Sequence, residues 1–278
     1  MMAAQLQQKR IAIIGSGISG QTCGYLLSQQ HQVTLFEANE RLGGHTATID
    51  LDIEDKTLAV DTGFIVFNDR TYPNFIKMMT QIGVASKATE MSFSVHNQAT
   101  GMEYNGHSLN TLFAQRRNLL KPRFYYFIIE ILRFNRLSKK ANETSQDNQG
   151  SLGEFLDQHG FSDYFATHYV LAMTAAIWSA SIDSCRDFPL QFFLSFLSNH
   201  GLLDIANRPQ WYVIEGGSRS YIPGLTQSIQ DIRLNCAVAS VKRCEGYVEI
   251  TSQNKTEQFD EVIFACHSDQ ALALLNDP

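Results

Sequence analysis

Three glycines follow a short apolar run near the start of the chain. The run covers residues 10–14, and Gly15, Gly17 and Gly20 come after it, before good helix formers over residues 21–30. Gly15 permits a tight turn out of a strand, Gly17 leaves the backbone open to a pyrophosphate, and Gly20 lets a helix pack close to a sheet. The amides at the start of that helix attract phosphate. The spacing therefore predicts a dinucleotide-binding turn.

An acidic residue lies at the end of the next apolar run. Glu37 ends residues 32–37 and lies 22 positions after Gly15. A carboxylate at the end of a strand accepts hydrogen bonds from both hydroxyls of an adenosine ribose and repels a 2′-phosphate, so NADP is disfavoured. Glycine spacing alone is weak evidence, and a glycine turn without a ligand is the alternative. A strand, turn, helix, strand and acid in one frame favour a dinucleotide site.

A second glycine-rich segment follows the acid. Arg41 precedes Leu42, Gly43 and Gly44, and His45 comes next. A guanidinium here can neutralise and orient a diphosphate, and a double glycine lets the backbone pass close to a bulky group. Taken alone, the segment is also consistent with a solvated arginine on an ordinary turn and with a structural histidine.

The composition limits the classes of protein that remain. With 44% hydrophobic and 18% charged residues among 278, the chain has enough apolar material for a buried core, which excludes bulk disorder. Its net charge of −6 gives no global basic field for nucleic acid. The five cysteines form no Cys-x-x-Cys pair, which predicts single thiols in a reducing compartment and therefore a cytoplasmic protein. The sequence shows no metal-ligand spacing and no Ser-His-Asp arrangement.

Helix and strand patterns divide the chain into three parts. Patterns of α/β type open it, helical patterns fill the middle, and strand-like runs close it. We therefore expect an α/β fold in which residues 1–90 and 206–278 form one discontinuous domain and residues 91–205 form a mainly helical domain. In the latter, residues 91–95 predict a strand and the polar residues 138–151 predict a flexible loop.

The two glycine-rich segments together resemble the FAD-binding start of the flavin-dependent amine oxidase superfamily, which includes monoamine oxidases, phytoene desaturases and protoporphyrinogen oxidase. The shared pattern is the glycine turn, a ribose glutamate and Arg-x-Gly-Gly. Residues 60–64 resemble the segment that runs beside the flavin. Residues 61–68 and 71–74 are particularly similar to a bacterial branch of NAD/FAD-binding, amine-oxidase-like proteins.

The resemblance returns near the end of the sequence. Residues 213–218 resemble the superfamily's second double-glycine turn, and residues 232–238 resemble the strand whose valine, here Val238, meets the adenine. Residues 259–265 resemble the strand that closes this part of the sheet. Two residues later the superfamily often has proline, whereas this chain has His267, a difference that affects the turn.

The resemblance implies a Rossmann-like FAD-binding domain with an inserted, mainly helical substrate domain. It also implies FAD as the cofactor, with no metal, and a set of cofactor-binding residues from these motifs: Gly15, Ser16, Gly17, Ile18, Ser19, Gly20, Glu37, Ala38, Arg41, Leu42, Gly43, Gly44, His45, Thr62, Gly63, Phe64 and Val238. The catalytic residues stay unknown, because a flavin performs the hydride chemistry and the protein supplies binding and orientation.

The activity implied by the resemblance is that of an FAD-dependent oxidoreductase, whose flavin accepts hydride from a C–N or C–C bond of a small or lipid-like substrate. Enzymes of this superfamily continue beyond the position of Pro278 with elements that hold the flavin, so the sequence is expected to be C-terminally truncated. A non-catalytic FAD-binding remnant is therefore one alternative. An NAD-dependent dehydrogenase that uses only the first motif is another, and Arg41 with its double glycine argues against it.

Two further segments leave a functional and a structural interpretation open. Residues 116–140 alternate lysines and arginines with aromatic and aliphatic residues. This pattern is typical either of a helix at an anionic membrane surface, in a peripheral membrane protein, or of a packing helix with solvated basic ends. Trp178, Trp211 and the aromatic residues of 188–196 either line an apolar pocket or belong to the core.

Overall fold

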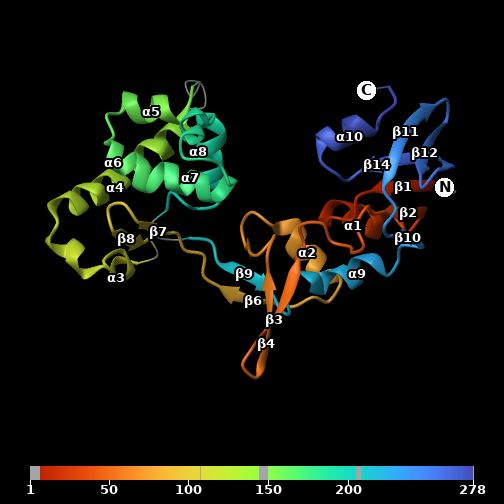
Figure 1. Ribbon diagram of the computed structural model, residues 1–278, viewed down its shortest axis with the longest axis horizontal. Helices are drawn as coiled ribbons and strands as arrows, with labels where there is room; N and C mark the ends of the chain where they lie inside the picture. Colours follow the sequence, from red (N-terminus) through yellow and green to blue (C-terminus); the bar gives the residue numbers. More distant parts are fainter. Residues whose placement is uncertain (1–6, 107, 144–149, 205–207, 278) are drawn as a thin grey trace, which may run out of the picture. The chain divides into compact units, whose positions relative to one another are not determined.

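The computed structural model describes residues 7–106, 108–143, 150–204 and 208–277, which form two compact units. Unit 1 consists of the described residues up to Phe67, then Pro73–Ala88, then the described residues from Tyr212 onwards. Unit 2 consists of Asn68–Tyr72 and the described residues from Thr89 to Trp211. Segments from both ends of the sequence therefore share one fold in unit 1 (Figure 1).

A four-stranded parallel sheet with the strand order β10-β2-β1-β14 organises unit 1. Its strands are β1 (Arg10–Ile14), β2 (Gln32–Phe36), β10 (Asp231–Arg233) and β14 (Glu261–Phe264). The apolar residues of β1 are almost completely buried, because a central parallel strand is covered on both faces. Helix α1 (Ile18–Leu27) joins β1 to β2 in the predicted βαβ unit. The predicted α/β class is confirmed.

A three-stranded antiparallel sheet packs against the parallel sheet. It consists of β11 (Val238–Cys244), β12 (Tyr247–Ser252) and β13 (Lys255–Phe259). One cluster of buried side chains unites residues of both sheets: Ala12, Ile14, Phe36, Val241, Ile250 and Phe259. Three helices complete this part of unit 1, namely α2 (Pro73–Gln81), α9 (Ile222–Thr226) and α10 (Ser268–Leu274).

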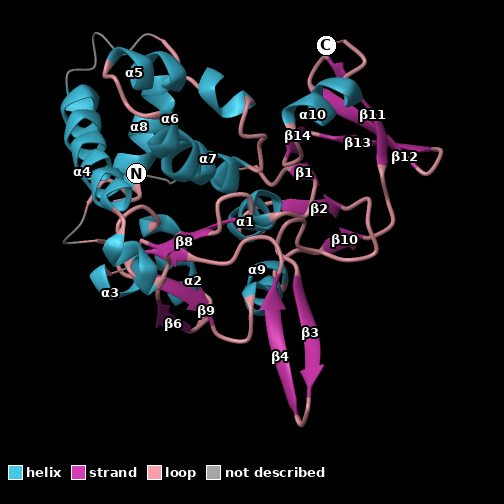
Figure 2. Cartoon of the chain, turned by 60° about the vertical axis from the view of Figure 1, so that its left-hand side comes forward, coloured by secondary structure: helices cyan, strands magenta, loops and turns pink. Residues whose placement is uncertain are grey.

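The hairpin of β3 (Thr48–Ile53) and β4 (Lys56–Asp61) projects from the rest of unit 1 (Figures 1 and 2). Its register pairs Ile49 with Val60 and Leu51 with Leu58. Directly paired residues lie on the same face of a hairpin. These four apolar side chains therefore form one exposed face, which we call the hairpin face.

A further small sheet has the order β5-β9-β6 and lies where the chain passes from one unit to the other. Its strands are β5 (Phe67–Asn68), β9 (Trp211–Ile214) and β6 (Ser86–Thr89). The three strands come from distant parts of the sequence, so the pairing depends on tertiary structure.

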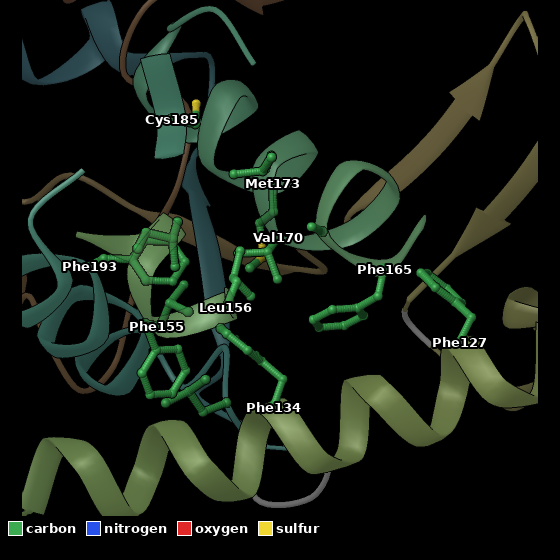
Figure 3. Close-up of a cluster of buried hydrophobic side chains, with 14 of the residues drawn as sticks. Phe127, Phe134, Phe155, Leu156, Phe165, Val170, Met173, Cys185 and Phe193 are labelled. Atoms are coloured by element: carbon green, nitrogen blue, oxygen red, sulfur yellow. The ribbon is translucent and has the colours of Figure 1, made fainter. Parts of the chain in front are cut away.

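Unit 2 is mainly helical and has an aromatic core. Its helices are α3 (Leu109–Leu112), α4 (Pro122–Glu143), α5 (Leu152–Gln158), α6 (Asp163–Phe165), α7 (Leu171–Trp178) and α8 (Leu190–Asn199). Figure 3 shows Phe127 and Phe134 of α4 directed toward the side chains of the other helices, among them Phe165. Burial of each large apolar side chain stabilises such a core by about 1.5–3 kcal/mol.

Trp178 belongs to this core. Its ring centroid lies 4.7 Å from those of Phe188 and Phe196 and 6.0 Å from that of Phe193. The ring of Trp211 stacks on His200 at 6.3 Å. These contacts favour the core interpretation of the aromatic residues over a pocket lining.

The structure corrects the predicted loop over residues 138–151. Helix α4 continues through Ser138, which is fully buried, to Glu143, and the residues between them include good helix formers. Residues 144–149 lie outside the described residues. Ser151 forms a capping box at the start of α5.

The strand predicted at 91–95 begins later than expected. The observed strand is β7 (Ser94–Asn97), which pairs with β8 (Met102–Asn105) in an antiparallel hairpin. The apolar residues at 91 and 93 precede the strand, because pairing with β8 sets its start rather than the local apolar run.

Candidate dinucleotide-binding site

The first glycine turn packs tightly against the edge of the parallel sheet. Gly15 has a φ of +104°, and a Cβ there would lie 2.6 Å from the carbonyl oxygen of Ala265, which follows β14. A Cβ on Gly20 would lie 1.9 Å from the carbonyl oxygen of Gly15. Both positions therefore require glycine, which lets α1 start close to the strand that precedes it.

Gly17 faces open space at the start of α1. No atom lies within 4 Å of the position that its Cβ would take. Gly17 is the N-cap of α1 and has no side chain that could accept a hydrogen bond from the first amides of the helix. The amide of Gln21 donates to the Gly17 carbonyl at 3.0 Å. The amides before Gln21 have no partner within the helix, and Ile18 and Ser19 are exposed beside them. This helix end can hold an anion.

Glu37 connects several parts of the site. Its side chain is 6% exposed and accepts four hydrogen bonds. The amide of Ser16 donates to Oε2 at 3.0 Å and the Ser16 hydroxyl donates at 2.5 Å. The amide and the side-chain nitrogen of Asn39 each donate to Oε1 at 2.9 Å. The carboxylate therefore lies at the carboxyl end of β2, attached to the glycine turn, with the exposed residues Ala38 and Asn39 beside it.

Burial and hydrogen bonding act in opposite directions on the pKa of Glu37. Desolvation raises the pKa, whereas the hydrogen bonds from Ser16 and Asn39 lower it, and the net pKa lies below the ordinary value of 4.5. The carboxylate is therefore ionised at neutral pH and can accept hydrogen bonds from ribose hydroxyls.

The second glycine-rich segment lies directly beside the first. The amide of Gly43 donates to the carbonyl oxygen of Ser16 at 3.1 Å and to its hydroxyl at 3.2 Å. A Cβ on Gly44 would lie 3.1 Å from the Cα of Gly17. Leu42 packs against the buried cluster behind the turn. Ser16 thus joins Glu37 to both glycine segments.

Arg41 supports the second segment from outside. Its guanidinium donates to the carbonyl oxygens of Gly44 at 3.0 Å and of Thr46 at 3.2 Å. Among the residues that the structure describes, no carboxylate pairs with Arg41. Its positive charge therefore has no carboxylate partner among those residues, and the segment that it binds lies beside Gly17, because Gly44 comes close to the Cα of Gly17.

The segment Thr62–Gly63–Phe64 runs beside His45. The amide of Phe64 donates to the His45 carbonyl at 3.2 Å, and a Cβ on Gly63 would lie 2.0 Å from the same oxygen. The ring of His45 stacks on that of His267 at 5.9 Å with an interplanar angle of 12°. In the sequence, His267 stands where the superfamily often has proline, and no local pattern predicts its contact with His45.

Val238 begins β11 and is partly buried against the cluster that contains Phe36. The residues before it are hydrogen bonded to the end of β2. The amide of Cys236 donates to the Glu37 carbonyl at 2.8 Å, and the amide of Asn235 donates to the Asn39 carbonyl at 2.9 Å. All the predicted site residues thus lie in unit 1, and their contacts with a cofactor stay a prediction.

Sequence reasoning missed the role of Asp61. Its two carboxylate oxygens accept hydrogen bonds from the Ser218 amide at 2.9 and 3.0 Å. The Ser218 hydroxyl donates to the carbonyl of Phe64 at 2.7 Å. These bonds attach the late double-glycine turn to the segment at Phe64. The sequence carries a signal for this role, since Asp61 stands directly before Thr62 in the segment that resembles the one beside the flavin.

The site fits a dinucleotide on its own geometry. The start of α1 and Arg41 supply positive potential beside the open position at Gly17, and an ionised Glu37 lies at the end of the next strand. In the described part of the chain, no group of His, Cys, Asp and Glu side chains is arranged to hold a metal ion.

Comparison with known proteins gives a match to one family model over most of the chain. The model for flavin-containing amine oxidoreductases matches residues 18–278. An L-amino-acid oxidase from Gloydius halys is 42% identical over 55 residues, which is 19% of this chain and 11% of the relative.

Solved structures share the fold at low sequence identity. Cyclohexylamine oxidase from Brevibacterium oxydans superposes with a TM-score of 0.74 at 18% identity, over 96% of this chain and 60% of that one. A fatty acid isomerase from P. acnes superposes with a TM-score of 0.66 at 16% identity, over 99% of this chain and 62% of that one. The Rossmann-like fold predicted from the sequence is confirmed, and the chain spans about three fifths of the length of these structures.

Proposed function

The chain belongs to the flavin-containing amine oxidoreductase family, and on that premise we propose that unit 1 binds FAD through the candidate site. The chain would act in a flavin-dependent oxidoreductase that takes hydride from a C–N or C–C bond of a small or lipid-like substrate. We assign the substrate side of the reaction to unit 2. The five free cysteines support a reducing, cytoplasmic location.

One observation carries the proposal, namely the hydrogen bonds that join Glu37, Ser16 and Gly43. They hold the ribose acid, the first glycine turn and the second glycine segment in one arrangement around the start of α1. In this arrangement Glu37 would accept hydrogen bonds from the ribose, with the exposed Asn39 side chain as the group that gives way. The amides of α1 and Arg41 would hold the diphosphate.

FAD, when bound, supplies the two-electron acceptor. The protein's part is to fix its adenosine end and to exclude other nucleotides. The charge of Glu37 disfavours a 2′-phosphate. Structures of similar fold include both an amine oxidase and a fatty acid isomerase, which is why the proposal keeps amines and lipid-like molecules as substrate classes.

The proposal is tested by titrating the purified chain with FAD and, in parallel, with NAD, followed by flavin absorbance and fluorescence. FAD should bind and NAD should not. Glu37→Gln should raise the Kd for FAD about tenfold to a hundredfold, because hydrogen bonds to a charged acceptor contribute about 1.5–3 kcal/mol. Glu40→Gln is the matched control, since Glu40 is exposed three residues away and should leave the Kd unchanged.

Two outcomes would contradict the proposal in different ways. Binding of NAD without FAD would favour a nicotinamide-dependent dehydrogenase. A chain that binds FAD but whose flavin is bleached anaerobically by neither amines nor lipid-like substrates would favour a non-catalytic FAD-binding protein.

A further inference from the structure

One side of helix α4 exposes large apolar side chains. Phe124, Phe127 and Phe134 face the core of unit 2 and are at most 2% exposed. On the other side lie four residues that are between 44% and 58% exposed, namely Tyr125, Tyr126, Ile129 and Leu132. Two leucines before the helix are exposed as well, Leu119 to 45% and Leu120 to 87%. Residues three, four and seven positions apart share one side of a helix. We call this set the outer face of α4.

The segment that carries the outer face is rich in cations. Residues 116–140 contain eight lysines and arginines and a single acid, in a chain whose net charge is −6. The acid, Glu130, is buried and accepts hydrogen bonds from the amide and hydroxyl of Ser162. Within the described part of the chain, no carboxylate pairs with Lys121 or Arg136. The local charge is therefore strongly positive, opposite to that of the whole chain.

A surface depression of about 550 Å³ lies at the C-terminal end of the same face. Its lining includes the apolar Leu132 and Leu203 and the cations Arg136 and Lys139, together with the acids Glu143 and Asp204. Lys139 pairs with Asp204 at 2.6 Å, whereas Arg136 has no carboxylate partner in the described part of the chain and can interact with an external anion. An apolar wall next to cations suits an anionic headgroup attached to an acyl chain.

We propose that the outer face of α4 docks on the surface of an anionic lipid bilayer. The exposed leucines, Ile129 and the tyrosines would enter the boundary between headgroups and acyl chains, while Lys121 and Arg136 contact lipid phosphates. A second copy of the chain fits less well, because a two-fold interface would place these cations opposite each other. None of the helices in the described residues is both long and apolar enough to cross a membrane. The proposal goes beyond the proposed function and does not depend on it.

The test measures flotation of the full chain with vesicles of phosphatidylcholine, alone and mixed with phosphatidylglycerol. We expect binding to the mixed vesicles only, weakening as salt rises. The double variant Lys121→Gln, Arg136→Gln should reduce the partition coefficient about thirtyfold, since each cation near such a surface contributes about 1 kcal/mol. The double variant Leu120→Ser, Ile129→Ser should reduce it about tenfold, because less apolar area is removed from water.

The hairpin face supplies a matched control. Leu51 and Leu58 are each 45% exposed, as several apolar residues of α4 are, but residues 48–61 of their hairpin contain five acids and a single cation, Lys56, so that the hairpin is negatively charged. Leu51→Ser with Leu58→Ser should leave vesicle binding unchanged. Circular dichroism and thermal unfolding of every variant check that the fold is retained.

Three results would overturn the proposal. The first is absence of binding to the anionic vesicles at low salt, and the second is equal loss of binding in the control pair. The third is a dimer in lipid-free solution, seen by sedimentation velocity, that Leu120→Ser with Ile129→Ser dissociates, because the face would then be an interface between copies of this chain.

Discussion

The two units depend on different kinds of interaction. The candidate site of unit 1 depends on backbone contacts that leave no room for a Cβ, and on a single carboxylate that accepts four hydrogen bonds. The core of unit 2 depends on side-chain volume, as in the rings of Phe155, Phe161 and Phe165 around Phe134. One added atom is therefore decisive in unit 1, whereas unit 2 should tolerate apolar substitutions that conserve volume.

Removal of volume from unit 2 is expected to have the largest effect. Phe134 is fully buried, so Phe134→Ala should lower the free energy of unfolding by about 3–5 kcal/mol, measured by urea denaturation. The control is Phe192→Ala, at a ring that is 54% exposed, which should cost much less. If the folded Phe134→Ala protein also lost affinity for FAD, the packing of unit 2 and the candidate site of unit 1 would not be energetically independent.

Addition of one carbon to unit 1 sharpens the comparison. Gly20→Ala should destabilise the fold by about 2–3 kcal/mol, because its Cβ would overlap backbone that cannot move as a flexible side chain would. The same change at Gly17 meets no atom within 4 Å. Gly17→Ala should therefore keep most of the stability but raise the Kd for FAD about tenfold, since a methyl group would stand between the helix amides and the diphosphate.

Thermal unfolding and FAD titration of the two glycine variants separate these effects. A Gly17→Ala protein as unstable as Gly20→Ala would show that Gly17 is structural. An unchanged Kd for FAD in Gly17→Ala would show that the diphosphate does not lie at the start of α1.

The candidate site was the more predictable region because its key residues are close in the sequence. The glycine turn, Glu37 and the double glycine lie within a single βαβ unit and the turn after it, so spacing alone indicates that they meet. Contacts between distant segments were not predictable in this way. His45 meets His267, and Asp61 meets Ser218, through pairings that no local pattern encodes.

Unit 2 shows a second limit of sequence reasoning. Ile129, Leu132 and Phe134 are all apolar and belong to one helix, yet only Phe134 is buried. Helical spacing indicates which residues share a face, but the neighbouring helices decide which face is covered. The predicted loop over 138–151 was wrong in its first residues for the same reason, since buried contacts extend α4 through a polar segment.

The smallest expected effect concerns the charge of Glu37. Its pKa in the folded protein lies below the ordinary 4.5, so the ionised form stabilises the fold fully above that value, and this contribution is lost as the pH falls through the folded-state pKa. The free energy of unfolding should therefore differ between wild type and Glu37→Gln at neutral pH and converge at acidic pH. Glu40→Gln is the control, since its side chain is exposed, and should leave the free energy of unfolding close to that of the wild type. If the free energies of unfolding of wild type and Glu37→Gln differed by the same amount from neutral to acidic pH, the hydrogen bonds from Ser16 and Asn39 would not depend on the charge of Glu37. The candidate site would then resemble the packed core of unit 2 more closely than we infer.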